Sequence, residues 1–224
     1  LLQWLEKNRE VVGPKGVRTL ILAPTRELAA QISESIRVYG RYLKIKQAVI
    51  YGGVRATLQI RALSRGVDVL VATPGRLLDL LNQRQLRLDK VGVLVLDEAD
   101  RMLDMGFLPD IKKICKVIPS NRQTMLFSAT LPSEIVKLSK EFLNDPIQVS
   151  VTPPSSTVDK IEQKVLFVDR ENKPALLESI LDEDQSIYRV LIFTRTKHGA
   201  DRVAKRLMKI KVPTEAIHGN KSQP

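Results

Sequence analysis

The sequence predicts an α/β protein built around a mostly parallel sheet. Short apolar runs alternate with segments whose apolar residues recur at helical spacing, which is the pattern of consecutive βαβ units. The clearest run, residues 91–96, is short and almost continuously apolar, as a strand covered on both faces must be. Two carboxylates, Asp97 and Glu98, follow it at once, where open α/β sheets place their ligands.

Composition limits the class of protein and of partner. A chain of 224 residues with 43% hydrophobic and 27% charged residues has the make-up of a soluble globular protein of one large or two smaller domains. Its net charge of +11 is spread along the chain, and aromatic residues make up 4%. Such a balance favours binding to a phosphate backbone over base stacking, although charge that serves solubility alone is the alternative.

Three features of the sequence bear on the cellular compartment of the protein. No run approaches the roughly 20 apolar residues that a membrane helix needs. No signal peptide is recognisable at the first residues, where the charges follow the apolar residues. The single cysteine, Cys115, rules out an internal disulfide, and we expect it to pack on a helix face. A cytoplasmic protein without a membrane partner is the expectation.

The order of the expected elements follows from the spacing of apolar residues and from Gly and Pro punctuation. The expected strands are residues 19–23, 47–51, 68–72, 91–96, 124–127 and 147–151. The expected helices are residues 4–9, a helix from Thr25 with Leu28, Ile32 and Ile36 on one face, a helix through Leu58, Ala62 and Leu63, residues 77–81 and 111–117, and a helix containing Ile135, Leu138 and Phe142.

A proline- and serine-rich run, residues 153–157, interrupts this rhythm and has the composition of a linker. We therefore predict a first domain over residues 1–152, a linker over 153–160 and part of a second domain over 161–224. Strands at 163–168, 190–193 and 214–217 are expected in the second part, with helices through Leu176, Leu177 and Leu181 and over about residues 199–208. About 60 residues are fewer than a self-sufficient parallel α/β domain usually needs.

Unusual residues follow five of the expected strands. They are Pro24-Thr25-Arg26-Glu27, Gly52-Gly53, Thr73-Pro74-Gly75-Arg76, Asp97-Glu98-Ala99-Asp100 and Ser128-Ala129-Thr130. In a parallel sheet all five lie at one edge, and each is close to a helix N-terminus, where free N–H groups favour anions.

Within these loops, Thr73 has the sequence of a capping residue before Pro74 in a first helical turn. Glycines allow close backbone approach, and Arg26 and Arg76 can pair with phosphate oxygens. Each loop alone has an ordinary explanation: a capped turn, a helix cap at Ser128 or a solvated arginine. Together, at one edge, they favour a site that grips successive phosphates of a nucleic acid without reading its bases.

In these motifs the chain resembles DEAD-box RNA helicases, which are superfamily-two ATPases built of two RecA-like domains. The matching motifs, in family order, are PTRELA at 24–29, GG at 52–53, TPGR at 73–76, DEAD at 97–100, SAT at 128–130, LIFTRTK at 191–197 and HGNKSQ at 218–223. The ordered set spans essentially the whole chain. The resemblance implies a RecA-like parallel sheet flanked by helices, followed by the start of a second RecA-like domain. IHGNKSQ is similar to the bacterial RhlE-like subgroup.

The resemblance also implies ATP and Mg²⁺ as cofactors and assigns roles to the acidic motif. Asp97 would hold Mg²⁺, through water, and with Glu98 would form the cofactor-binding pair. Glu98 would orient or deprotonate the attacking water. Asp100 would form hydrogen bonds with Ser128 and Thr130 that couple nucleotide state to domain placement.

RNA would be bound without sequence preference through its sugar-phosphate backbone. The residues that the resemblance assigns to RNA binding in the first domain are Pro24, Thr25, Arg26, Gly52, Gly53, Thr73, Pro74, Gly75 and Arg76. Those in the second are Thr194, Arg195, Thr196, Lys197 and Gly219. The sequence indicates no particular protein partner.

The family's phosphate-binding loop, G-x-x-x-x-G-K-[ST], does not occur in this sequence. The glutamine-containing adenine motif and the motifs that carry the arginine fingers are also missing. We expect a fragment of a longer helicase that is inactive by itself. The alternative is a non-enzymatic RNA-binding relative that acts as a scaffold, although such a protein has no chemical need for Glu98.

Overall fold

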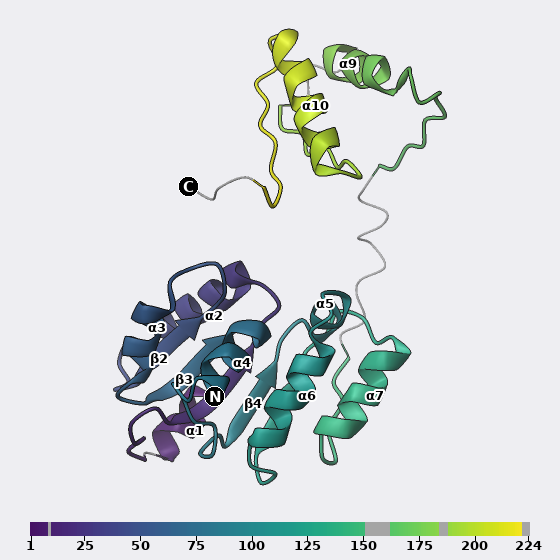
Figure 1. Ribbon diagram of the computed structural model, residues 1–224. Coiled ribbons are helices and arrows are strands. Elements are labelled where there is room, and N and C mark those ends of the chain that lie inside the picture. Colours follow the sequence, from purple (N-terminus) through teal and green to yellow (C-terminus); the bar gives the residue numbers. More distant parts are fainter. Residues whose placement is uncertain (9, 151–161, 184–187, 221–224) are drawn as a thin grey trace. The chain divides into compact units, whose positions relative to one another are not determined.

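The computed structural model divides the chain into two compact units, Leu1–Val149 and Ser150–Pro224 (Figure 1). It describes residues 1–8, 10–150, 162–183 and 188–220. The predicted boundary after residue 152 and the predicted linker, 153–160, lie outside the described residues.

The first unit contains a five-stranded sheet in which every pair of neighbours is parallel. The strand order is β2-β3-β1-β4-β5. The strands are β1 (Val17–Leu22), β2 (Gln47–Ile50), β3 (Val67–Ala72), β4 (Val93–Leu96) and β5 (Gln123–Leu126). The chain builds the sheet to one side of β1 and then returns to the other side, so the order reverses between β1 and β4. The predicted fold class is confirmed.

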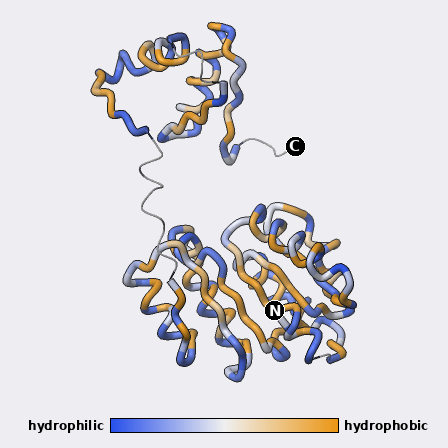
Figure 2. Tube along the Cα trace, turned by 180° about the vertical axis from the view of Figure 1, so that it is seen from behind, coloured by the Kyte–Doolittle hydropathy of each residue, from blue (hydrophilic) through white to orange (hydrophobic). Residues whose placement is uncertain are grey.

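Helices cover both faces of this sheet. They are α1 (Leu2–Lys7), α2 (Arg26–Tyr39), α3 (Ala56–Leu63), α4 (Pro74–Asn82), α5 (Ala99–Asp104), α6 (Leu108–Val117) and α7 (Ser133–Phe142). Successive side chains of a strand point to opposite faces. Leu20 and Leu22 accordingly pack with α4 and α6, whereas Ile21 packs with α1 and α2. Figure 2 shows the strands as apolar segments inside the unit.

One predicted strand of the first unit is absent. The sixth strand, expected at residues 147–151, does not form over its described part, 147–150, where Ile147 is 93% exposed. In α3, Leu58 is 75% exposed, whereas Gln59 is buried. The reason is that Gln59 finds hydrogen-bond partners for both ends of its amide, so its burial costs little.

The described part of the second unit contains two helices, α9 (Lys173–Glu183) and α10 (Lys197–Lys209), close to where they were predicted. The strands predicted at 163–168, 190–193 and 214–217 do not form. Phe167 and Phe193 are 97% and 87% exposed. Parallel strands of this composition need paired neighbours and cover on both faces, and these segments have neither among the described residues. No helix among the described residues is long and apolar enough to cross a membrane.

Candidate functional site

The parallel sheet brings the five predicted loops to its carboxyl edge and sorts them into two groups. The loops after β2, β3 and β1 are neighbours, and we call Gly52–Gly53, Thr73–Arg76 and Pro24–Arg26 the glycine–arginine group. The loops after β4 and β5 are neighbours on the other side, and we call Asp97–Asp100 and Ser128–Thr130 the acidic group. The order along the chain hides this division, because the β1 loop comes first in sequence and lies in the middle of the sheet.

In the glycine–arginine group, Arg26 lies against the Gly52–Gly53 loop. Its Nη1 donates to the carbonyl oxygen of Gly52 at 3.4 Å. Gly53 has a φ of +79°, and a Cβ built on it would lie 2.3 Å from Arg26 Nη1. Gly53 is therefore required twice, for its left-handed backbone and for the space that Arg26 occupies.

Arg76 holds the same loop from the other side. Its Nη2 donates to Val54 O at 3.0 Å, and its Nη1 donates to Gln59 Oε1 at 3.1 Å. Its Nε lies 3.6 Å from Asp79 Oδ2, and the Arg76 side chain is 13% exposed. Both predicted phosphate-binding arginines thus also fix the backbone of the glycine loop.

The two threonines that begin helices in this group behave differently. Thr25 is the N-cap of α2, and its hydroxyl accepts a hydrogen bond from the Leu28 N–H at 3.2 Å. Thr73 is the N-cap of α4 with Pro74 in the first turn, but its side chain makes no capping bond. The prediction that the Thr73 hydroxyl caps α4 is therefore wrong. Thr73 is held in place by its backbone instead, since its N–H donates to Ile50 O at 3.0 Å.

In the acidic group, Asp97 directly follows β4 and is half-buried. The Glu98 N–H donates to Asp97 Oδ1 at 3.0 Å. Burial raises the pKa of Asp97, the hydrogen bond from Glu98 lowers it, and the Glu98 carboxylate raises it further. Asp97 is thus a partly dehydrated carboxylate at the end of a buried strand.

Glu98 has a left-handed backbone, with φ 48° and ψ 55°. This conformation is costly for a residue with a side chain and recurs at functional sites, although Lys15, Arg84, Asp145 and Lys211 also have a positive φ in this chain. Its Oε2 accepts from Arg101 Nη1 at 3.4 Å, and both side chains are largely exposed. The turn directs the chain from β4 into α5 and leaves the Glu98 carboxylate accessible.

Asp100 joins the two loops of the acidic group. Its Oδ2 accepts from the backbone N–H of Thr130 at 2.9 Å and from Thr130 Oγ1 at 2.7 Å. The Asp100 N–H donates to Ser128 Oγ at 3.2 Å, and Ser128 Oγ donates to Thr130 O at 2.7 Å. The hydrogen bond from the Thr130 hydroxyl is the main cause that lowers the pKa of Asp100. The hydrogen bonds expected between Asp100, Ser128 and Thr130 are present.

The predicted residues of the second unit form a cluster within that unit. Thr196 is the N-cap of α10, and its hydroxyl accepts from the Gly199 N–H at 3.0 Å. Thr194 Oγ1 donates to Thr196 O at 3.0 Å. Lys197 Nζ donates to Asn220 Oδ1 at 2.9 Å, beside Gly219. Arg195, the remaining member of the predicted set, is exposed.

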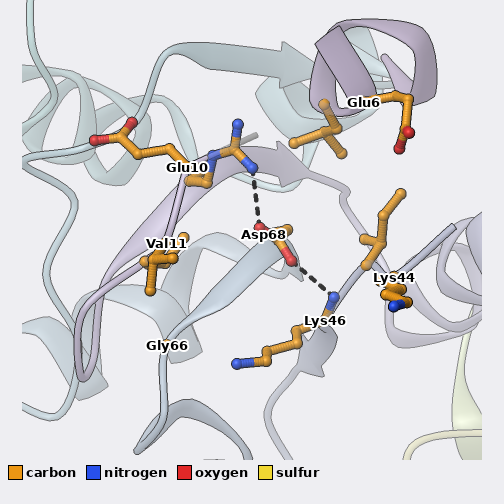
Figure 3. A pocket seen from close by; sticks show the side chains of 11 residues that line it. Glu6, Glu10, Val11, Lys44, Lys46, Gly66 and Asp68 are labelled. Carbon is orange, nitrogen blue, oxygen red and sulfur yellow. Dashed lines mark hydrogen bonds and ion pairs between the residues drawn. The ribbon is translucent and has the colours of Figure 1, made fainter. Parts of the chain in front are cut away.

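A cavity of about 260 Å³ lies at the opposite, amino edge of the sheet (Figure 3). Arg18 at the start of β1 pairs with Asp68 at the start of β3, with Nη1 and Oδ1 3.1 Å apart and side chains 6% and 14% exposed. The Lys46 N–H donates to the other Asp68 oxygen at 2.8 Å. No residue of the five strand-end loops is among the described residues that line this cavity. The Asp68 carboxylate joins three strand starts, through the Arg18 guanidinium and the Lys46 backbone N–H.

Sequence reasoning missed two residues that the structure adds to the site. Gln59 links α3 to the glycine loop and to Arg76. Arg101 pairs with Glu98. A signal for Arg101 was its position three residues after Glu98, which places the two on one side of a helical turn. For Gln59 the signal was weak, since a polar residue between Leu58 and Ile60 is usually solvated.

Comparisons with known proteins agree with this geometry. The family model described as DEAD/DEAH box helicase matches residues 1–138. The chain is 46% identical over 210 residues to DEAD-box ATP-dependent RNA helicase 40 of Oryza sativa subsp. japonica, covering 93% of this chain and 26% of that protein. It is 47% identical over 214 residues to ATP-dependent RNA helicase dbp2 of Schizosaccharomyces pombe, covering 93% of this chain and 38% of that protein.

A solved structure is also similar, that of a DEAD box protein from the hyperthermophile Methanococcus jannaschii. The TM-score is 0.57 at 36% identity, over 95% of this chain and 56% of the solved one. The chain spans about a quarter to two fifths of the length of the two relatives above. The RhlE-like subgroup stays a prediction. The match of the family model over more than half of the residues shows that this chain belongs to the DEAD/DEAH box helicase family.

Proposed function

We propose that this chain is part of an ATP-dependent RNA helicase, an RNA-stimulated ATPase that binds the RNA backbone and locally unwinds or remodels RNA. The observation that carries the proposal is the pairing of two groups on one sheet edge, one rich in glycine and arginine and one rich in carboxylates. The names of the similar proteins support it, since the two quoted relatives are called ATP-dependent RNA helicases.

The acidic group supplies the hydrolytic half of this function. Glu98 orients or deprotonates the water that attacks the terminal phosphate of ATP, a role that needs an accessible carboxylate. Asp100 does not touch ATP in this scheme. Through Ser128 and Thr130 it ties the loop after β4 to the loop after β5, so a shift at one loop is transmitted to the other.

Mg²⁺ is the metal that suits Asp97. No group of three or more His, Cys, Asp or Glu side chains among the described residues could hold a metal ion. Mg²⁺ does not need such a group, because it keeps several waters and is usually bound by one or two carboxylates together with substrate phosphates. When bound, it neutralises charge on those phosphates. Asp97 would hold it through water.

The glycine–arginine group binds the RNA sugar-phosphate backbone in this proposal. Arg26 and Arg76 supply positive charge beside the Gly52–Gly53 loop, and Gly53 permits close approach. Contacts of this type position an RNA strand and carry no sequence information. The cluster around Thr196 and Lys197 in the second unit would hold the continuation of the strand. We also propose a cytoplasmic location.

A second candidate is an RNA-binding scaffold without ATPase activity. The sequence contains no phosphate-binding loop, which this candidate would explain. The accessible carboxylate of Glu98 favours the enzyme, because binding alone has no need of a general base at this position.

The experiment compares the 224-residue chain with the full-length gene product for RNA binding and for phosphate release from ATP. We expect both proteins to bind single-stranded RNA of any sequence, with an affinity that falls as salt rises. Turnover stimulated by RNA is expected in the full-length product and not in the chain alone. RNA binding without turnover in the full-length product would favour the scaffold, and absence of RNA binding would contradict both candidates.

A further inference from the structure

Gln59 is a buried polar residue that the proposed function does not use. Of the described residues, four buried ones are polar or charged, and Gln59 is 8% exposed. Its Nε2 donates to Tyr51 O at 3.1 Å, and its Oε1 accepts from Arg76 Nη1 at 3.1 Å. A buried amide with both ends bonded has one defined orientation, so the two groups that it joins are held in one relative position.

The groups that Gln59 joins are the glycine loop and one of its arginines. Three carbonyl oxygens of the loop accept from side chains: Tyr51 O from Gln59, Gly52 O from Arg26 and Val54 O from Arg76. Gln59 therefore acts on the loop twice, directly at its start and through Arg76 at its end.

The loop's N–H groups are in a different situation from its carbonyls. Within the described part of the chain, those of Gly53 and Val54 donate to no protein acceptor, and both residues are exposed. Successive free N–H groups in a turn form a concavity that suits an anion such as a phosphate oxygen. With three of the four loop carbonyls held by side chains, these two N–H groups are donors that the loop can offer to a ligand.

We propose that Gln59 is a positioning residue for RNA-backbone binding. It keeps the loop Tyr51–Val54 and the Arg76 guanidinium in the arrangement that receives a phosphate. The inference rests on the proposed function, because it assigns Gln59 to the RNA-binding side of that same site. The proposal predicts that replacing Gln59 weakens RNA binding although Gln59 itself does not touch RNA.

The test replaces Gln59 with methionine, which preserves length and volume and removes both hydrogen bonds. RNA-stimulated ATP turnover of the full-length gene product is measured against the concentration of a single-stranded oligouridylate. We expect Gln59→Met to raise the RNA concentration for half-maximal stimulation about tenfold, while kcat at saturating RNA stays within about twofold. Gln3→Met is the matched control, since Gln3 is an exposed glutamine of α1 outside the strand-end loops, and it should change neither quantity.

A double-mutant cycle separates positioning from general stability. If Gln59 acts through Arg76, Gln59→Met should cost less RNA affinity in an Arg76→Ala background than in the natural protein. Additive losses, or a fall in kcat that follows a fall in melting temperature, would show a purely structural role and overturn the proposal. Should Gln59→Met not fold, Gln59→Asn is measured instead, because its shorter side chain withdraws the amide from both partners.

The outcomes also distinguish this inference from the function on which it rests. If the natural protein binds RNA and the Gln59→Met variant binds it with the same affinity, the role of Gln59 is overturned and the proposed function stands. If the natural protein does not bind RNA and its ATP turnover does not respond to RNA, both the role of Gln59 and the proposed function are overturned.

Discussion

Thr130 donates two hydrogen bonds to a single oxygen of Asp100, one from its backbone N–H at 2.9 Å and one from its hydroxyl at 2.7 Å. The two residues are 30 positions apart in the chain and belong to loops that follow neighbouring strands. The pair gives the acidic group a defined geometry and lowers the pKa of Asp100.

The first prediction concerns this pKa. Thr130→Val removes the hydroxyl bond, so the pKa of Asp100 should rise toward its ordinary value of 3.8, whereas Thr130→Ser should leave it low. Carboxyl carbon chemical shifts, followed by NMR against pH, measure it. In the same titration Asp97, whose pKa burial raises, should titrate at higher pH than Asp100. The reverse order would contradict the assignment.

The sign of the pH dependence follows from the direction of the shift. The folded pKa of Asp100 lies below its unfolded value, so its stabilisation is complete above the unfolded value of about 3.8 and is lost as pH falls through the folded one. The contribution of Asp97 has the opposite sign, because its folded pKa is raised. Thr130→Val should therefore reduce the loss of stability on acidification below about pH 4, relative to natural protein.

The second prediction tests Glu98 in the full-length gene product. Glu98→Gln keeps the shape of the side chain but removes the base, so ATP and RNA binding should persist while turnover falls by about 10²–10⁴. The matched control is Glu34→Gln, since Glu34 also pairs with an arginine three residues later, Arg37, and lies on α2 outside the strand-end loops. Unchanged hydrolysis in Glu98→Gln would remove Glu98 from its role.

The third prediction separates backbone strain from displacement of Arg26. Gly53 and Gly106 have similar φ values, +79° and +77°, but a Cβ at Gly53 would strike Arg26 Nη1 whereas one at Gly106 meets nothing within 4 Å. Each change to alanine should cost about 1 kcal/mol of stability through the left-handed backbone. Gly53→Ala alone should also weaken RNA binding, by about fivefold to tenfold. Equal RNA affinities in the two variants would exclude the Arg26 contact as a determinant.

The fourth prediction concerns the amino edge of the sheet. Asp68→Ala leaves the guanidinium of Arg18 buried without its carboxylate, which should lower the free energy of unfolding by about 3–5 kcal/mol. Asp89→Ala breaks the exposed pair with Arg87 and should cost less than about 1 kcal/mol. Urea denaturation of the 224-residue chain measures both. Similar losses in the two variants would mean that the Arg18–Asp68 pair is not a buried link between strands.

The fifth prediction is that Cys115 reacts slowly in the folded protein. Burial raises the pKa of its thiol from 9.0 to about 11, which lowers the thiolate fraction at neutral pH roughly a hundredfold. Alkylation by iodoacetamide at pH 7 should be slower by at least that factor than in urea. Rapid alkylation of the folded chain would contradict the packing of Cys115, on α6, against the core.

Particular elements show how far sequence pattern reached and where it failed. The helix with Leu28, Ile32 and Ile36 on its inner face was predicted correctly, because a strong 3.6-residue period leaves one buried face. The helix expected through Leu58, Ala62 and Leu63 forms as α3, but its sequence pattern did not indicate that Gln59 is buried while Leu58 is exposed, since that depends on hydrogen bonds to Tyr51 and Arg76. The strands expected around Phe167 and Phe193 were correct in composition but lack paired neighbours among the described residues.

By itself the sequence determined the fold class of the first unit and which residues make up its five strand-end loops. The reason is that the spacing of apolar residues and the order of the motifs are local properties of the chain. The tertiary structure decided which loops are neighbours. Strand order places the loop after β1 between those after β3 and β4, so that the glycine–arginine group and the acidic group meet at β1 and β4. It also decided the partners of Asp100 and Gln59, since hydrogen bonds between residues far apart in the chain depend on distances that no local pattern encodes.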